Sequence, residues 1–217
     1  MIDHERKFVF LHIPKTAGMS IGTLLYDNLG IEKVYEGFKI HHDDLTEDIL
    51  RDYFVFTFVR NPWDRLYSQY KFRNWLRHTT FDFAARNLET LFKVKYGISI
   101  EEMLEKHSID LSNALSRANF YAEFVHLPSQ VQYLQGVYND GIDKFPYIDY
   151  IGRFENLQED FTFIAETIGL QNSTVPYLNR KKSPYCYTEM YSEDLKEYVG
   201  KKYIDDITKF NYTFNGI

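Results

Sequence analysis

The stretch that most constrains this chain is an apolar strand that runs directly into a loop of small residues and then into a helix. Residues 7–13 are mostly apolar, and Pro14-Lys15-Thr16-Ala17-Gly18-Met19-Ser20 follows. Residues 18–29 place Ile21, Leu24, Leu25 and Leu29 on one helical face. Main-chain N–H groups at a helix start are unpaired and lie at the positive end of the helix dipole, so with Lys15 they suit a phosphate or sulfate group. The sequence therefore predicts a phosphate-bearing ligand at this loop.

The loop differs from the ordinary nucleotide-triphosphate loop. The pattern G-x-x-x-x-G-K-[ST] needs an opening glycine and a Gly-Lys pair, and both are missing here. A triphosphate enzyme also normally holds a metal ion with a carboxylate placed after a strand. The second strong strand, residues 53–59, ends instead in Arg60, which favours direct contact with an anion. We therefore expect no metal at this site.

Strands and helices alternate along much of the chain. After the second strand, Asn61 is a good N-cap and Pro62 takes the first helical position, so a helix is predicted from there to about Leu76. Other helices are predicted near 44–51, 99–107, 130–137 and 155–168 and after the cap Ser192, and other strands at 34–35 and 147–151. This alternation predicts an α/β fold, a P-loop-type three-layer sandwich with a mostly parallel central sheet and helices on both faces. Ligands of such sheets bind beyond the carboxyl ends of the strands, where Lys15 and Arg60 both fall.

Length and composition limit the remaining possibilities. A chain of 217 residues fits one domain, 1–217, in which we interpret 77–127 as a helical insertion that contributes to acceptor binding. No segment reaches the ~18 apolar residues of a membrane span, and no signal peptide is recognised, so we expect a cytoplasmic protein. The formal charge of −6 argues against a nucleic-acid partner, and a single cysteine excludes an internal disulfide. Composition does not predict the oligomeric state.

Two motifs together resemble a known family. The first is the run from Ile13 to Ser20, and the second is Phe58-Val59-Arg60-Asn61-Pro62-Trp63-Asp64-Arg65-Leu66-Tyr67-Ser68-Gln69-Tyr70. In this order they resemble the sulfotransferases that use 3′-phosphoadenosine 5′-phosphosulfate (PAPS), specifically the carbohydrate branch with the heparan and chondroitin enzymes. Asp149–Leu157 and Tyr203–Tyr212 add to the similarity, which is weakest over 77–127.

The resemblance implies a donor site and a product. The loop residues would bind the 5′-phosphosulfate; they are Lys15, Thr16, Ala17, Gly18, Met19 and Ser20. Arg60 and Ser68 would hold the 3′-phosphate, and Lys182 and Ser183 resemble a Lys-Ser pair that some relatives place against the donor. The reaction would move a sulfuryl group to an acceptor hydroxyl, on a saccharide, and leave adenosine 3′,5′-bisphosphate (PAP). Lys15 can neutralise the charge that builds on the departing 5′-phosphate oxygen.

The acceptor hydroxyl needs a base, and histidine accepts a proton near neutral pH. In related heparan enzymes a histidine precedes a similar Asp-x-Thr-Glu pattern, and alignment through Thr46 and Glu47 selects His42 as that catalytic base. The alternatives are His41, Asp43 and Glu36.

Other interpretations of the same residues stay open. Arg60 could pair with Asp64 as an ordinary helix-start ion pair, and Ser68 could be a solvated helical serine. Residues such as Arg86, Arg117 and Tyr121 could line a sugar groove or be solvated surface. A small-molecule kinase with the same sheet, or a non-catalytic glycan-binding protein, are the alternative functions.

Overall fold

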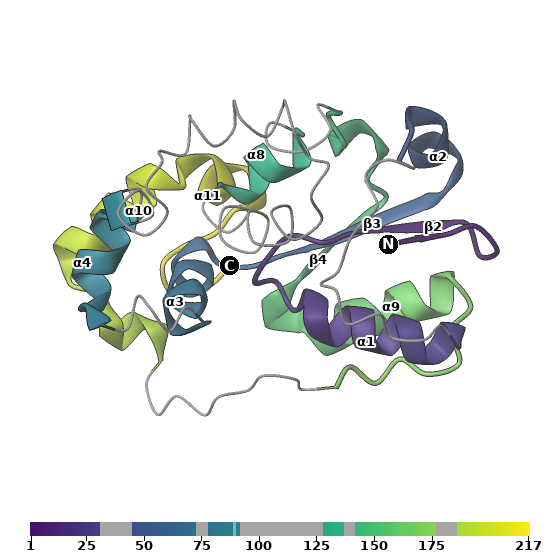
Figure 1. Cartoon of the computed structure of the whole chain (residues 1–217), viewed down its shortest axis with the longest axis horizontal. Coiled ribbons are helices and arrows are strands. Elements are labelled where there is room, and N and C mark those ends of the chain that lie inside the picture. Colours follow the sequence, from purple (N-terminus) through teal and green to yellow (C-terminus); the bar gives the residue numbers. More distant parts are fainter. Residues whose placement is uncertain (31–44, 73–77, 89, 92–127, 137–141, 177–185) are drawn as a thin grey trace. The chain divides into compact units, whose positions relative to one another are not determined.

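The described part of the chain falls into two compact units. The computed structural model describes residues 1–30, 45–72, 78–88, 90–91, 128–136, 142–176 and 186–217 (Figure 1). The first unit comprises Met1–Arg60 and Gln130–Lys182, and the second comprises Asn61–Ser129 and Ser183–Ile217. The expectation of a single domain over 1–217 stays a prediction.

The first unit is built on a mixed, mostly parallel sheet. Its strands, in spatial order, are β1 (Ile2–Asp3), β2 (Phe8–Leu11), β3 (Phe54–Val59) and β4 (Tyr150–Arg153). β1 pairs with β2 antiparallel, whereas β2, β3 and β4 are parallel. Leu11 is opposite Thr57, and Val59 is opposite Arg153. The loops that follow β2, β3 and β4 therefore leave the sheet at the same edge.

Helices cover both faces of this sheet, as the sequence predicts. In Figure 1, α1 (Gly18–Leu29) and α9 (Leu157–Thr167) lie below the strands, and α2 (Glu47–Asp52) and α8 (Gln130–Leu134) lie above them. Alternate strand residues point to opposite faces, so one face of the sheet presents a set of phenylalanines to α1 and α9. The buried cluster includes Phe8, Phe10, Phe56, Phe58, Ile21, Leu25, Phe161 and Ile164. The predicted α/β architecture is confirmed.

The second unit is helical in its described residues. It contains α3 (Pro62–Phe72), α4 (Phe81–Arg86), α10 (Glu193–Lys202) and α11 (Ile204–Phe210). Asn61 caps α3 as predicted, because its Oδ1 accepts the Trp63 N–H at 3.2 Å, and its Nδ2 also donates to the Thr213 carbonyl at 2.8 Å. The core of this unit is formed by Trp63, Leu66, Tyr67, Phe81, Ala84, Ala85, Leu88, Leu195, Val199 and Tyr203.

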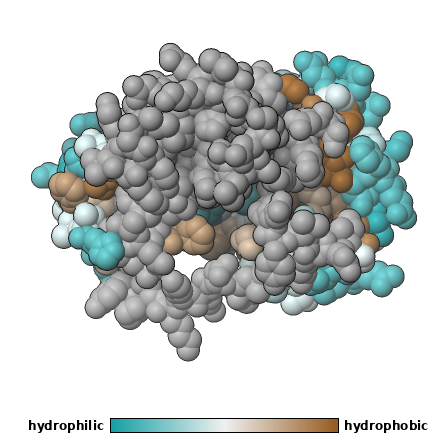
Figure 2. Space-filling view, in the orientation of Figure 1, coloured by the Kyte–Doolittle hydropathy of each residue, from teal (hydrophilic) through white to brown (hydrophobic). Residues whose placement is uncertain are grey.

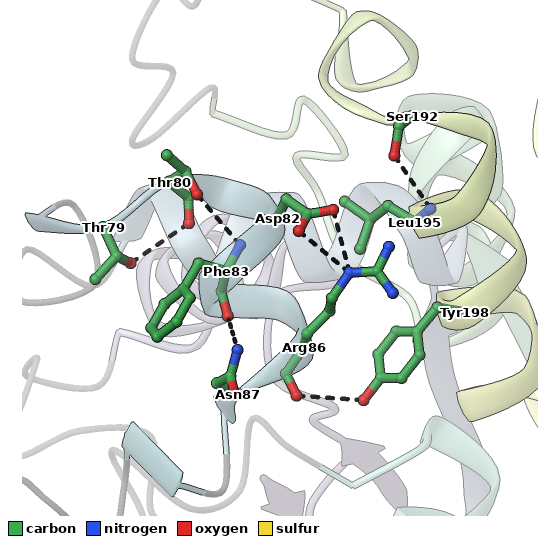
Figure 3. A network of polar contacts seen from close by, with 9 residues as sticks. All are labelled: Thr79, Thr80, Asp82, Phe83, Arg86, Asn87, Ser192, Leu195 and Tyr198. Atoms are coloured by element: carbon green, nitrogen blue, oxygen red, sulfur yellow. Dashed lines mark hydrogen bonds and ion pairs between the residues drawn. The ribbon is translucent and has the colours of Figure 1, made fainter.

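A polar network ties α4 to α10 (Figure 3). Arg86 Nε lies 3.2 and 3.1 Å from the two carboxylate oxygens of Asp82. Its guanidinium lies over the Tyr198 ring, with 5.2 Å between Cζ and the ring centroid. Arg86 thus has protein partners within its own unit, whereas Arg117 and Tyr121 fall outside the described residues.

Several elements differ from their predicted bounds. The first strand spans Phe8–Leu11 rather than 7–13, and the fourth begins only at Tyr150 because Phe145–Tyr147 form a 3₁₀ turn, η3. The helix predicted at 155–168 is preceded by a second 3₁₀ turn, η4 (Phe154–Asn156). The elements predicted at 34–35 and 99–107 lie outside the described residues.

The C-terminal helix predicted after Ser192 is interrupted. Ser192 caps α10 through a 3.2 Å bond from the Leu195 N–H. α10 ends at Lys202, and α11 begins at Ile204. A last 3₁₀ turn, η5 (Tyr187–Met190), precedes α10.

In the described ranges, none of the helices is long and apolar enough to cross a membrane. On the face drawn in Figure 2 the described residues expose mainly hydrophilic side chains, with smaller hydrophobic areas between them. Exposed apolar residues of this scattered kind are normal at a protein surface.

Candidate functional site

The loop after β2 has a strongly turned backbone. Lys15 and Ala17 both take left-handed conformations, with φ of 72° and 74°. Left-handed backbone is uncommon for residues other than glycine, and within such turns neighbouring N–H groups form concavities that bind anions. Ala17 is also the N-cap of α1 and makes no side-chain cap hydrogen bond. The loop backbone therefore turns sharply directly before the first turn of α1.

The amides of this loop are available to an anion. Ser20 and Ile21 donate their N–H groups to the Ala17 carbonyl at 2.9 and 3.1 Å. No acceptor among the described residues takes the main-chain N–H groups of residues 16–19. Unpaired amides at the first turn of a helix form an anion-binding site.

The threonine and the serine of the loop have different environments. Thr16 is fully buried, and its hydroxyl donates to the Ile13 carbonyl at 2.7 Å. This bond closes the loop on itself and engages the hydroxyl proton. Ser20 is 7% exposed, on the first turn of α1.

His12 packs against the loop from the end of β2. A Cβ atom built on Gly18 would lie 1.8 Å from His12 Nε2 and 1.9 Å from Cδ2, so only glycine fits at position 18 with the imidazole in place. Burial lowers the pKa of His12 to about 3, with smaller contributions from the positive charges of the Met1 amino group and Lys15. The imidazole is therefore neutral at physiological pH, and the positive charge of Lys15 lies near it.

Arg60, directly after β3, reaches the same loop. Its Nη1 donates to the Lys15 carbonyl at 3.1 Å. Its guanidinium carbon lies 3.7 Å from the centroid of the Phe154 ring, which follows β4. An arginine over an aromatic face is held by cation–π attraction and by stacking. The ends of three neighbouring strands thus meet around the Arg60 side chain.

The main chain of Arg60 is held by a side chain of α8. Gln130 Oε1 accepts the Arg60 N–H at 2.8 Å, and Gln130 Nε2 donates to the Arg60 carbonyl at 2.9 Å. Gln130 is fully buried. Its carboxamide therefore makes the same pair of bonds with Arg60 that a neighbouring strand would make.

The other predicted site residues are placed as follows. Ser68 is half-buried on α3, in the second unit, so its joint action with Arg60 on one phosphate stays a prediction. Met19 is 51% exposed on the first turn of α1. The remaining candidates lie outside the described residues; they are His42, His41, Asp43, Glu36, Lys182 and Ser183.

The motifs missed two contributors, Gln130 and Phe154, and His12 contributes by packing beside the loop. Gln130 lies 70 residues from Arg60 in sequence, and a contact between such distant residues leaves no local pattern. Phe154 falls within Asp149–Leu157, a stretch of the family resemblance that carries no role of its own. His12 precedes the loop directly, and the glycine at position 18 is the one sequence signal that something packs there.

In the described ranges, no group of three or more His, Cys, Asp or Glu side chains is arranged to hold a metal ion. What the site offers is a cationic residue at each of two adjacent strand ends and a helix start with unpaired amides. These groups fit a ligand with more than one anionic group.

Comparison with known proteins adds one finding. The sequence profile of the sulfotransferase family matches residues 1–213, nearly the whole chain. No curated protein and no solved structure gives a significant match.

Proposed function

Because this chain belongs to the sulfotransferase family, we propose that it transfers the sulfuryl group of PAPS to an acceptor hydroxyl on a carbohydrate. The observation that carries the proposal is the contact of Arg60 Nη1 with the Lys15 carbonyl at 3.1 Å. It joins the two cation-bearing strand ends, and PAPS carries two separate anionic groups, at its 3′ and 5′ positions.

The loop after β2 suits the 5′-phosphosulfate. The amides of residues 16–19 are donors, and we assign the Ser20 hydroxyl, on the first turn of the same helix, a further contact with the donor. Thr16 acts through its amide, since its hydroxyl is engaged with the Ile13 carbonyl. Lys15 supplies the charge that opposes the growing negative charge on the leaving phosphate oxygen.

Arg60 is assigned to the 3′-phosphate together with Ser68. A guanidinium donates two parallel hydrogen bonds to a phosphate and stays charged at any physiological pH. Lys182 and Ser183 are proposed as further contacts of the donor on the strength of the family resemblance.

The chemical step is an in-line displacement at sulfur. The acceptor oxygen attacks sulfur, the bond from sulfur to the 5′-phosphate oxygen breaks, and its electron pair remains on PAP. The hydroxyl proton goes to the base, for which we propose His42, with His41, Asp43 and Glu36 as alternatives. Positioning and charge stabilisation supply most of the catalysis in transfers of this kind.

The acceptor follows from the resemblance to the carbohydrate branch of the family. We propose a saccharide hydroxyl as acceptor, with residues 77–127 contributing to its binding. A panel of saccharides offered with radiolabelled PAPS identifies the acceptor, and a panel of small-molecule alcohols and phenols is the comparison.

Calorimetric titration with PAP in the presence of a chelator tests donor binding directly. We expect PAP to bind without magnesium and Lys15→Ala to weaken it roughly 10-fold or more, because a charge-assisted contact is lost. Lys201→Ala, which removes an exposed lysine of α10, is the matched control and should bind as the wild type does. Binding of ATP or GTP with magnesium, and none of PAP, would replace the proposal by a kinase.

Single-turnover transfer of labelled sulfate tests the base. His42→Ala should bind PAP normally and lose transfer, and His41→Ala should retain it. Full transfer by His42→Ala would move the role to an alternative residue. A wild-type protein that binds PAP and glycans but transfers no sulfate is the non-catalytic glycan-binding alternative.

A further inference from the structure

Arg60 stands at the point where β3 ends and the regular strand pairing stops. β3 pairs with β4 as far as Val59, opposite Arg153. Beyond that point the Gln130 carboxamide accepts the Arg60 N–H at 2.8 Å and donates to the Arg60 carbonyl at 2.9 Å. These two bonds hold the main chain of Arg60 and so set the direction in which its side chain leaves it.

The far end of the same side chain is also held. Phe154 lies under the guanidinium, 3.7 Å from Cζ to the ring centroid, and the Lys15 carbonyl accepts from Nη1 at 3.1 Å. The contacts come from α8, from the turn after β4 and from the loop after β2, all within the first unit. A long, flexible side chain is thus fixed at both its root and its head.

We propose that Gln130 and Phe154 are positioning residues that preset Arg60 to receive the 3′-phosphate of the donor. The proposal rests on the proposed function, since it takes Arg60 as the 3′-phosphate ligand. The physical reason is that a free arginine loses much rotamer freedom when it binds, and a preset arginine has lost it already. Affinity for the 3′-phosphate is therefore gained without any contact between Gln130 and the ligand.

A purely structural role for Gln130 makes a different prediction. If its bonds only satisfied the end of β3, their loss would weaken the whole site, and every donor analogue would be affected alike. If they preset Arg60, the loss falls on ligands that carry a 3′-phosphate. Adenosine 5′-monophosphate lacks that group and should be almost unaffected.

The test compares the affinities of PAP and adenosine 5′-monophosphate in Gln130→Met. Methionine has a similar length and volume but makes neither hydrogen bond, and folding is checked by circular dichroism and thermal unfolding. We expect PAP affinity to fall roughly 5–10-fold, the value of one immobilised side chain, and the affinity for the monophosphate to stay within twofold.

The chain provides a control in Gln158, an exposed glutamine whose carboxamide makes the same types of bond. Its carboxamide also bridges a main-chain pair, with Nε2 donating to the Ser173 carbonyl at 2.9 Å and Oε1 accepting the Val175 N–H at 3.0 Å. It belongs to α9, in the same unit, and contacts neither Arg60 nor the loop after β2. Gln158→Met should therefore leave both affinities unchanged.

The outcomes distinguish a failure of the proposed function from a failure of the positioning role. Failure of the wild-type protein to bind PAP would overturn the proposed function itself. Normal PAP binding by Gln130→Met, or an equal loss for both ligands, would overturn the positioning role and leave the function standing. If Gln130→Met does not fold, Phe154→Leu is measured in its place, because it removes the ring under Arg60 and keeps the main-chain bonds, and the same contrast between ligands decides.

Discussion

The ends of β2 and β3 lie at one edge of the sheet, and each carries a cation, yet they are built in different ways. The loop after β2 is shaped by residues close to it in sequence: Thr16 bonds to Ile13, and Gly18 packs on His12. Arg60 after β3 is held by residues 70 and 45 positions away, Gln130 and Lys15. One strand end is thus organised locally and the other by the tertiary fold.

This difference determines how each strand end responds to amino-acid substitutions. The loop after β2 depends on contacts between neighbouring residues, so we expect substitutions within it to act mainly on stability. An arginine held from three elements tolerates local changes better, but its binding geometry depends on distant side chains. Measured stability reports on the first kind of dependence, and ligand affinity reports on the second.

The largest effect is expected from Gly18→Ala. The new Cβ would lie 1.8 Å from His12 Nε2, so the imidazole or the helix start has to move. Overpacking of a buried contact costs about 1–3 kcal/mol, and we expect the upper end of that range in the free energy of unfolding, measured by denaturant titration. PAP binding should weaken as well.

A double mutant tests whether contact with the His12 ring causes the loss of stability in Gly18→Ala. In His12→Ala the obstructing ring is absent, so Gly18→Ala made on that background should cost much less than it does in the wild-type protein. An equal cost on both backgrounds would mean that the glycine is needed for another reason, such as its backbone freedom.

The next largest effect is a dependence of the free energy of unfolding on pH, caused by His12 at the end of β2. The pKa of His12 is lowered to about 3, mainly by burial, whereas an unfolded histidine titrates near 6.5. Between these values the unfolded chain binds more protons, so stability falls as the pH falls below about 6.5. From pH 7 to pH 5 the loss assigned to His12 is about 2 kcal/mol.

His12→Gln removes this titration. The difference in unfolding free energy between pH 7 and pH 5 should shrink by that amount relative to the wild-type protein, in urea titrations at the two pH values. An unchanged difference would assign the acid sensitivity to other groups, of which the Met1 amino group, with a pKa lowered to about 5 by burial, is the first to examine.

Arg60→Lys tests the second strand end. The charge is kept, but the planar fork that donates two parallel hydrogen bonds is lost. We expect PAP affinity to fall about 10-fold, with little change in the free energy of unfolding or in the affinity for adenosine 5′-monophosphate. Equal weakening for both nucleotides would place Arg60 at the 5′ side of the donor.

The sequence predicted the local features of the fold well. The helix 18–29 has the predicted bounds, and Asn61 and Ser192 cap the helices assigned to them, because caps and apolar periodicity are short-range signals. β1 was not predicted, since a strand of two residues carries no pattern. The interruption at Tyr203 was missed because both helical segments continue the same apolar face.

For the site, as for the fold, the sequence predicted the local features and missed the distant contacts. Lys15 and Arg60 follow from strand ends and the parallel sheet, which bring them to one edge. Gln130 could not be identified, because it lies in the crossover between β3 and β4, 70 residues from Arg60, and such a distant contact leaves no local pattern. Local signals therefore locate the cations, and tertiary structure determines how one of them is held.

The smallest predicted effect sharpens the contrast between the two strand ends. Thr16→Val removes the buried hydroxyl bond to the Ile13 carbonyl and leaves the loop amides in place. We expect the free energy of unfolding to fall by about 1 kcal/mol, the net value of one hydrogen bond, and PAP affinity to change less than threefold, because the hydroxyl proton is engaged within the loop. Thr57→Val, which removes the buried bond to the Leu11 carbonyl between β2 and β3, is the matched control for stability. A large loss of PAP affinity in Thr16→Val alone would show that the hydroxyl turns to the donor on binding, and that the locally organised loop is less fixed than its contacts indicate.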